Sequence, residues 1–315
     1  MAAVTNPNKD CPFATITPDR ADEGMVDVDK DLVEKVFKKH GAILFRGFDL
    51  DVGIFTGLTQ KYCTHAAIND SPGRDVIDRE NCIQTVNLDD VAFPLHPELS
   101  MVPWKPDVCW FGCLTPPESG GETVLCDGVK IVSKMSTKVL KAYKAKRLRY
   151  AQPAKTSELK FWLKTEEPTD EQLKKMPPDC PFIFYKNYGV MIRAYETPCL
   201  HKPMFTDKLA FGNFLLFSRY LHRDKEFPIF EDGSEVPDRL VEAVKKISDK
   251  ITVPIEWQAK DVAMVDNTRF LHGRNFVKDL DQRFIMTYFG YLKFADPPKG
   301  EENAPWRKKG GLLAL

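Results

Sequence analysis

The chain has 315 residues, and its 45 Lys and Arg residues balance 45 Asp and Glu residues, so the formal net charge is zero. This balance argues against a nucleic-acid partner, since nucleic-acid-binding proteins usually carry a basic excess, and 43% hydrophobic and 29% charged residues exclude a disordered or fibrous chain. No apolar run approaches the roughly 18 residues of a membrane helix, and the first residues do not resemble a secretory signal, so we expect a cytoplasmic enzyme or binding protein without a membrane partner.

The first part of the chain predicts a helix, a buried strand and a second helix. Residues 29–39 place apolar side chains at helical spacing, and Gly41 supplies the left-handed turn that commonly ends a helix. Residues 42–45 form a short apolar run that predicts a buried strand, and residues 54–62 predict another helix.

The central part mixes extended segments with helices. Residues 84–126 are rich in Pro, β-branched and aromatic residues, which indicates strands. Its Cys109 and Cys113 are expected to be buried free thiols, because none of the eight cysteines has Cys-x-x-Cys spacing. The pattern then predicts, in order, a solvated basic helix over 133–147, a mobile polar excursion over 155–180, a hairpin of strands 182–185 and 190–193, and a helix over 236–251.

Strands return at the end of the chain. Residues 262–266 and 284–291 are apolar or aromatic and bounded by turn residues. Short strands in two distant parts of a chain suit a jelly roll, with the intervening helices outside. We therefore expect a mainly β fold with flanking helices, forming one domain over 1–315. It would have an N-terminal segment over 1–62 and insertions over about 130–260 between the jelly-roll halves.

The first candidate metal ligands are His96 and Glu98. On a strand the side-chain period is two, so both would point to one side and could reach one ion. A second histidine would complete a triad of two His and one carboxylate, which leaves open positions on non-haem Fe(II). His222 and Asp224 repeat the His-x-acid spacing, but they lie in a charged stretch that favours a solvated surface.

Three further features of the sequence favour His96 as a metal ligand. Ser119 to Thr123 contains two glycines that allow a sharp turn, followed by a hydroxyl. His272 follows the strand 262–266 and supplies the second histidine. Arg283 opens the last aromatic strand, where a guanidinium is costly to bury without an anion. Its planar fork suits a carboxylate, although an internal salt bridge is an alternative.

Together these segments resemble the Fe(II)- and 2-oxoglutarate-dependent dioxygenases of the taurine dioxygenase and clavaminate synthase superfamily. The matching segments, in the family's order and at its spacing, are His40–Phe48, Leu95–Ser100, Gly120–Thr123 and Asp266–Arg274, followed by Arg283. The resemblance implies a double-stranded β-helix core, in which His96, Glu98 and His272 bind Fe(II). It also implies that Arg283 and Thr123 bind the distal carboxylate of 2-oxoglutarate.

The implied reaction consumes 2-oxoglutarate and O2, releases succinate and CO2, and oxidises an unactivated C–H bond by hydroxylation, desaturation or cyclisation. Clavaminate synthase-like members use Glu as the carboxylate ligand, as Glu98 would be here. The resemblance argues against a halogenase, because halogenases replace this carboxylate with a small residue. Thr287 stands where taurine dioxygenase has a second Arg, which argues against a sulfonate substrate.

Relatives with a Glu ligand often oxidise amino acids or small peptides, so we expect an amino-acid- or peptide-derived substrate and a role in natural-product biosynthesis. Gln84, Asn87 and Arg193 are polar residues in predicted strands and are candidate substrate contacts, while the excursion 155–180 is a candidate lid. Two other functions use the same residues: a zinc hydrolase with a metal-bound water, and a jelly-roll binding protein without catalysis.

Overall fold

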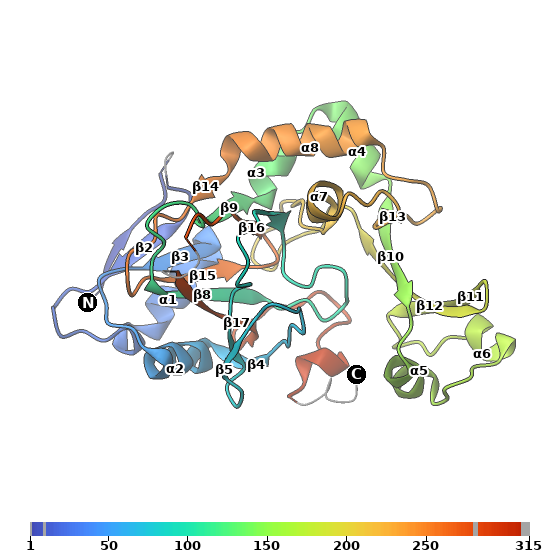
Figure 1. Cartoon of the computed structure of the whole chain (residues 1–315), viewed down its shortest axis with the longest axis horizontal. Coiled ribbons are helices and arrows are strands. Elements are labelled where there is room, and N and C mark those ends of the chain that lie inside the picture. The colour runs from blue at the N-terminus through green and yellow to red at the C-terminus, as the bar shows by residue number, and fades with distance from the viewer. Residues whose placement is uncertain (1, 9–10, 280–282, 310–315) are drawn as a thin grey trace.

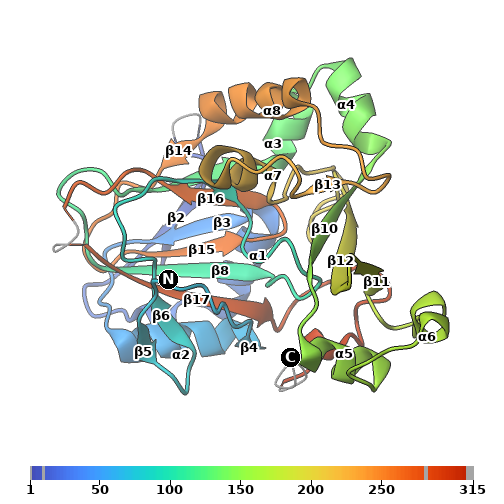
Figure 2. The same cartoon turned by 45° about the vertical axis from the view of Figure 1, so that its right-hand side comes forward.

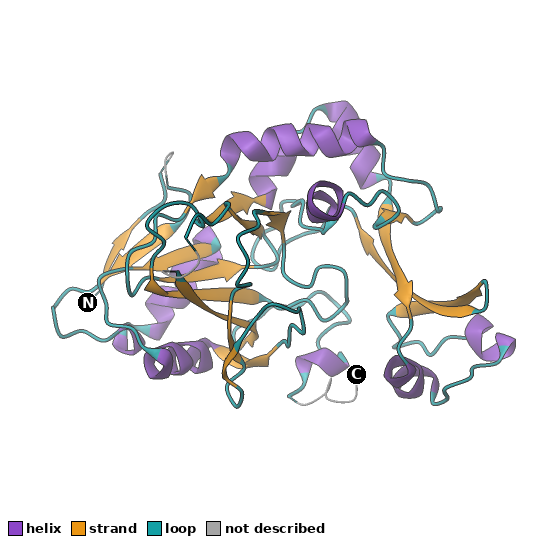
Figure 3. Ribbon diagram, in the orientation of Figure 1, coloured by secondary structure: helices purple, strands orange, loops and turns teal. Residues whose placement is uncertain are grey.

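The computed structural model describes residues 2–8, 11–279 and 283–309. Two β-sheets form the centre of the molecule, helices cover their outer faces, and a third sheet lies to one side (Figures 1, 2 and 3). None of the helices in these ranges is long and apolar enough to cross a membrane.

The major sheet contains nine strands drawn from both ends of the chain. Its order is β1-β2-β3-β15-β8-β17-β6-β5, with β4 also paired to β17. In chain order these strands are β1 (Ala3–Thr5), β2 (Ala14–Thr17), β3 (Ala42–Phe45), β4 (Cys63–Ala66), β5 (Val76–Asp78), β6 (Ile83–Thr85), β8 (Val108–Thr115), β15 (Val262–Asp266) and β17 (Phe284–Leu292).

The minor sheet lies against the major sheet and supplies most of the site. Its order is β14-β9-β16-β7, from β7 (Phe93–His96), β9 (Thr123–Asp127), β14 (Val253–Pro254) and β16 (Phe270–Arg274). The third sheet has the order β11-β12-β10-β13, from β10 (Arg147–Pro153), β11 (Phe182–Asn187), β12 (Val190–Pro198) and β13 (Ile229–Phe230).

Strand periodicity places the core on both faces of each sheet. In β8, Cys109 and Phe111 belong to the cluster between the sheets, whereas Val108 and Trp110 pack on the opposite side with the N-terminal helices. In β16, Phe270 faces the interior and Leu271 packs outward. Because alternate residues share a face, His272 lies on the interior face of β16.

Helices cover the outer faces of the two sheets (Figure 3). The major sheet carries a short 3-10 turn (Met25–Asp27), α1 (Lys30–His40) and α2 (Val52–Tyr62). The minor sheet carries α3 (Gly128–Ser133), α4 (Thr137–Lys144), α7 (Leu215–Phe217) with its π-helical continuation (Ser218–His222), and α8 (Asp238–Ile251). The remaining helices are α5 (Thr156–Leu163), α6 (Asp170–Lys174) and a 3-10 turn (Pro305–Arg307).

Two sequence predictions for the middle of the chain are wrong. Residues 133–147 do not form one helix: α3 ends at Ser133, Ser136 caps α4 by accepting from the Val139 amide at 3.4 Å, and β10 begins at Arg147. Residues 155–180 are not an irregular excursion. They contain α5 and α6, and α5 buries three large apolar side chains in the central core, namely Leu159, Trp162 and Leu163.

The mainly β jelly-roll fold with flanking helices is confirmed. So are the helices α1, α2 and α8, the strands β3, β15 and β17, and the hairpin β11–β12, each within a few residues of its predicted bounds. Cys109 and Cys113 are fully buried free thiols, as expected. The division into one domain with an N-terminal segment and central insertions stays a prediction.

Candidate metal centre and substrate cavity

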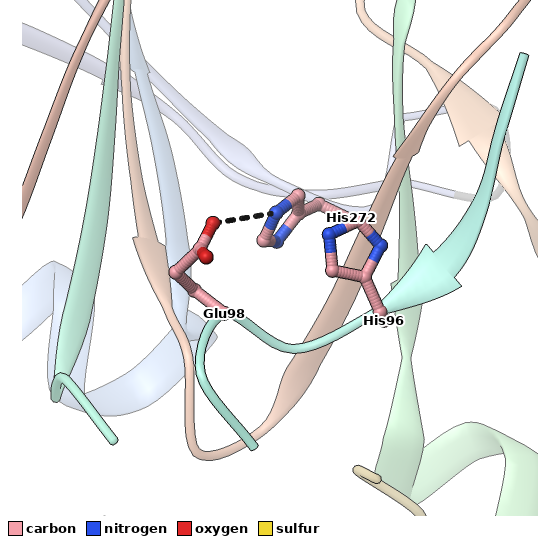
Figure 4. Close-up of side chains that lie close together, drawn as sticks. All are labelled: His96, Glu98 and His272. Carbon is pink, nitrogen blue, oxygen red and sulfur yellow. Dashed lines mark ion pairs between the residues drawn. The ribbon is translucent and has the colours of Figure 1, made fainter. Parts of the chain in front are cut away.

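Three predicted ligands meet between the two sheets. Each of His96, Glu98 and His272 offers one ligand atom, and these atoms all lie within 4.8 Å of one another (Figure 4). In the described ranges, no other group of three His, Cys, Asp or Glu side chains converges in this way. The arrangement follows from pairing of β16 with β7, which sets His272 opposite His96.

Each histidine presents a nitrogen to the centre. His96 Nδ1 lies 2.8 Å from the backbone carbonyl of Pro94 and donates to it, which leaves the Nε2 lone pair for a metal. His272 Nε2 lies 3.7 Å from Glu98 Oε2, and the two imidazole ring centroids are 4.6 Å apart. Burial, with a smaller contribution from the neighbouring His272, lowers the pKa of His96 to about 3, so the His96 imidazole is neutral and able to ligate.

Glu98 reaches the centre from a turn and not from the strand. β7 ends at His96, so the predicted period-two argument does not place Glu98. Instead the Asn267 side chain accepts from the Glu98 amide at 2.7 Å and donates to the Glu98 carbonyl at 3.0 Å. Asn267 is buried at the end of β15 and clamps the turn after His96.

The Glu98 carboxylate is buried and only half satisfied. Asn69 Nδ2 donates to its Oε1 at 2.6 Å, whereas Oε2 has no hydrogen-bond partner. Burial raises the pKa of Glu98, but His272 and the Arg74 guanidinium outweigh it and hold the pKa at about 2. Arg74 and His272 approach Oε2 only to 3.7 Å, so this buried, ionised oxygen has room for a closer cation and no hydrogen-bond donor. The residues therefore fit a divalent metal ion.

Arg283 lies buried just before β17. Its Nε donates to the Gly121 carbonyl at 3.0 Å, and among the described residues it makes no ion pair with a carboxylate. Burial, helped by the charge of Arg274, lowers its pKa to about 10, so the guanidinium remains charged. A buried cation without a carboxylate partner among the described residues favours the binding of an external anion.

Thr123 begins β9 on the same interior face as His272. The two strands pair with Leu125 opposite His272, and Thr123 lies two residues before Leu125. Trp257 Nε1 donates to Thr123 Oγ1 at 3.2 Å, so the hydroxyl proton of Thr123 remains to be donated elsewhere. Gly121 connects the two predicted cosubstrate residues, since its carbonyl holds Arg283 and it lies two positions before Thr123.

A cavity of about 830 Å³ opens onto His96 and Glu98, within the range usual for small-molecule sites. Four phenylalanines line it together with polar side chains; the aromatic members are Phe93, Phe214, Phe217 and Phe227. The Phe217 ring lies 4.6 Å from the His96 ring, centroid to centroid. An apolar wall therefore stands next to the metal ligands.

The predicted substrate residues separate into two groups. Asn87 lines the cavity, whereas Gln84 and Arg193 do not. Arg193 is buried elsewhere, with Nη1 2.5 Å from Glu158 Oε1 and Nη2 2.6 Å from Gln152 Oε1. No residue of 155–180 lines the cavity, so the predicted lid has no support here. His222 and Asp224 line the cavity too, but they do not join the metal cluster.

Arg74 is a residue that the sequence analysis missed. It lines the cavity, and its Nη2 lies 3.7 Å from Glu98 Oε2. It stands in an irregular segment without a motif, and only the pairing of that segment with residues 84–88 brings it to the site.

Comparisons with known proteins agree with this geometry. A sequence profile of the taurine catabolism dioxygenase TauD, TfdA family matches residues 18–287. The chain belongs to this family. It is a non-haem iron dioxygenase that uses 2-oxoglutarate and O2 as cosubstrates, which decides against the zinc hydrolase and the non-catalytic jelly roll. A search among curated proteins finds no significant match to the sequence.

Solved structures show the same fold at low sequence identity. The PvcB protein from Pseudomonas aeruginosa has a TM-score of 0.62 at 12% identity, covering 95% of this chain and 94% of the other. A second PvcB structure, described as an Fe, alpha-ketoglutarate dependent oxygenase from an isonitrile synthetic pathway, has a TM-score of 0.58 at 13% identity, with coverages of 95% and 94%. A taurine dioxygenase from Burkholderia xenovorans has a TM-score of 0.61 at 13% identity, covering 92% of this chain and 89% of the other.

Proposed function

We propose that this dioxygenase oxidises an unactivated C–H bond of a small amino-acid- or peptide-derived metabolite in natural-product biosynthesis, with release of succinate and CO2. In this proposal His96, Glu98 and His272 hold Fe(II), and Arg283 and Thr123 bind the distal carboxylate of 2-oxoglutarate. One observation supports the proposal above all. Ligand atoms of His96, Glu98 and His272 converge, and the buried Glu98 Oε2 has no hydrogen-bond donor.

The chain's own residues orient the reaction. Iron with 2-oxoglutarate and O2 supplies the oxidising power, while the protein supplies position and exclusion of water. The two histidines and Glu98 would hold the metal and would leave its other positions to the cosubstrates. The guanidinium of Arg283 and the hydroxyl proton of Thr123 fix the far end of the keto acid, and the phenylalanines beside His96 place an apolar C–H bond near the metal.

A spectroscopic experiment tests the metal and cosubstrate assignments. Anaerobic addition of Fe(II) and 2-oxoglutarate should produce a visible metal-to-ligand charge-transfer band. His272→Ala should abolish the band, whereas His222→Ala should retain it, because His222 lies outside the ligand cluster. Full succinate production by His96→Ala would show that the ligand assignment is wrong.

The substrate class requires a separate experiment. Succinate release is measured over a panel of amino acids, N-acylated amino acids and small peptides, and product masses are recorded. A gain of one oxygen identifies hydroxylation, and a loss of two hydrogens identifies desaturation or cyclisation. The likeness to PvcB is in keeping with a substrate of this kind. Succinate release by none of the panel above the substrate-free rate would contradict the proposed class.

A further inference from the structure

Arg74 lines the substrate cavity, and its guanidinium has N–H groups without a hydrogen-bond acceptor among the described residues. Its side chain is 10% exposed. Nε donates to Asn87 Oδ1 at 3.1 Å, and Nη1 donates to Thr287 Oγ1 at 3.3 Å. Nη2 forms no hydrogen bond with any described residue, since its contact with Glu98 Oε2 is an ion pair at 3.7 Å. At least the two N–H groups of Nη2 therefore remain available to a ligand.

The surroundings fix this guanidinium in place. Asn87 Nδ2 donates to the Pro72 carbonyl at 3.2 Å, and the Leu88 amide donates to the Gly73 carbonyl at 2.9 Å, which ties the segment before Arg74 to the strand region beside it. The guanidinium carbon lies 5.1 Å from the Phe289 ring centroid. A rigid, stacked arginine loses little freedom when it binds a planar anion.

A metal ion bound to Glu98 would compete with Arg74 for the charge of this carboxylate. Glu98 is the one carboxylate within 4.0 Å of Arg74 among the described residues, and the metal would take up its charge. The other carboxylates that line the cavity do not replace it: Asp89 pairs with Arg274, Asp224 accepts from the Glu226 amide, and Glu226 is exposed. Iron, Arg74 and Arg283 together exceed the charge of Glu98 and a 2-oxoglutarate dianion by one positive charge.

Arg74 also contacts the last strand of the major sheet. Thr287 lies on β17, and its hydroxyl accepts from Arg74 Nη1. Arg74 lines the same cavity as the four phenylalanines, so this cavity suits a carboxylate that is attached to an apolar body.

We propose that Arg74 binds the free carboxylate of the substrate, and that the phenylalanines near His96 hold an aromatic or aliphatic side chain of the same molecule. This inference rests on the proposed function. It narrows the substrate class to amino-acid-derived acids whose carboxylate is neither esterified nor amidated. Arg74 is then a specificity-determining residue, since an amide in place of the acid leaves its N–H groups without an anion.

Matched probes test the inference by binding alone. N-Acetyl-L-phenylalanine and N-acetyl-L-phenylalaninamide are titrated anaerobically, by calorimetry, into protein saturated with Fe(II) and 2-oxoglutarate. The acid should bind on the order of ten-fold or more tightly than the amide, as expected for a charge-assisted pair. Equal affinities, or no binding of the acid at 10 mM (about the upper limit of a weak specific site), would overturn the inference.

Variants locate the effect on Arg74. Arg74→Gln should reduce the acid-to-amide ratio to about one, and Arg74→Lys, which keeps the charge but loses the fork, should give an intermediate ratio. Arg79→Gln removes an exposed arginine from the same part of the chain and should leave the ratio unchanged. A ratio unaffected by Arg74→Gln would refute the inference. If Arg74→Gln does not fold, the acid-to-amide affinity ratios of the wild type and of Arg74→Lys still test the inference.

Different results would contradict the proposed function and the role of Arg74. Absence of the charge-transfer band in wild-type protein contradicts the iron and 2-oxoglutarate assignment, whatever the probes do. A normal band with equal affinities for acid and amide contradicts only the role of Arg74. Retention of the band by Arg74→Gln is expected, because its nearest approach to a ligand atom is 3.7 Å.

Discussion

Two buried asparagines, Asn69 and Asn267, position Glu98 by hydrogen bonds. Asn267 holds the backbone of Glu98 and also donates to the Pro106 carbonyl at 2.9 Å, so that it joins three parts of the chain. Asn69 fixes one carboxylate oxygen and leaves the other facing the histidines. Such supporting contacts orient metal ligands and raise their affinity for the metal.

Gly121 provides a direct test of the Arg283 assignment. Its φ is +66°, and a Cβ there would lie 3.1 Å from Arg283 Cδ and 3.3 Å from Arg283 Nε. Gly121→Ala should therefore displace the guanidinium and weaken 2-oxoglutarate binding on the order of ten-fold, the effect of one charge-assisted contact. The measurement is a titration of the charge-transfer band with 2-oxoglutarate.

Gly189 is the matched control for Gly121. Its φ is +81°, and a Cβ there would meet nothing within 4 Å. Both alanine variants carry a left-handed backbone cost of about 1–2 kcal/mol, but only Gly121→Ala touches Arg283. Equal 2-oxoglutarate affinities for the two variants would contradict the role of Arg283.

At the scale of elements, the Arg193–Glu158 pair joins α5 to β12. Both side chains are buried, and the Arg193 guanidinium also lies 4.8 Å from the Phe182 ring centroid. Glu158→Gln should destabilise the protein by about 3–5 kcal/mol because it leaves a buried guanidinium without its anion. Denaturant unfolding measures this loss.

The same variant separates structure from substrate binding. Asp249→Asn, which breaks the exposed Lys245–Asp249 pair, should cost less than about 1 kcal/mol. Below the denaturation midpoint, Glu158→Gln should bind N-acetyl-L-phenylalanine as wild type does, since neither member of the buried pair lines the cavity. A large loss of affinity without loss of stability would instead support the sequence-based prediction that Arg193 contacts substrate.

Asp266, at the end of β15, gives stability a pH dependence. Burial raises its pKa to about 6 from 3.8, although Thr268 and the charge of Arg269 lower it, and the Asp107 carboxylate adds repulsion. Between these two pKa values the folded state binds more protons than the unfolded state. The contribution of Asp266 is therefore favourable at low pH and is lost as pH rises toward 6.

Asp266→Asn should remove this loss. Asn keeps the Oδ1 acceptor that binds the Thr268 amide and hydroxyl, so the variant should be more stable than wild type at pH 7 by about 1–3 kcal/mol. Thermal unfolding at pH 5 and pH 7 provides the measurement, with the exposed Asp207→Asn as control. An equal gain at both pH values would count against titration of Asp266.

Local signals account for the elements that the sequence predicted well. Asp29 caps α1, and Gly41 ends it in the left-handed conformation. Both boundaries can therefore be predicted from the residue types at these positions. Continuous apolar or aromatic runs place β15 and β17, because both faces of the major sheet are buried. The wrong predictions for residues 133–147 and 155–180 arose where local signals are weak or where tertiary contacts decide the structure. Ser136 begins a new helix inside a continuous basic pattern, and α5 is held by tertiary burial of Trp162.

The cluster of candidate metal ligands could be predicted from the sequence, whereas Arg74 could not. His96, Glu98 and His272 stand in two short motifs of the sequence, and the structure brings their side chains together. Arg74 has no motif, and its nearest partners, Asn87 and Thr287, lie in two other segments. Arg74 lies in an irregular segment, and sequence patterns carry little information about how such segments pack.

For the whole molecule, the proposed metal is a link between distant parts of the chain. His96 and Glu98 follow the early strands, His272 lies on β16 near the end, and 2-oxoglutarate would add Arg283 before β17. A ligand that binds only the folded state stabilises it by mass action. Metal and cosubstrate should therefore stabilise the whole jelly roll and not only the loops around the site.

Thermal unfolding with Mn(II), which does not react with O2 and 2-oxoglutarate, tests this coupling. At about 100 times the dissociation constant each ligand adds about 2.7 kcal/mol, so Mn(II) with 2-oxoglutarate should raise the Tm by several degrees in a chain of this size. Glu98→Ala should lose the rise caused by Mn(II), and Gly121→Ala should lose mainly the further rise caused by 2-oxoglutarate. His222→Ala, whose side chain lies outside the ligand cluster, should show both. A full Mn(II) response in Glu98→Ala would mean that the metal binds elsewhere in the molecule.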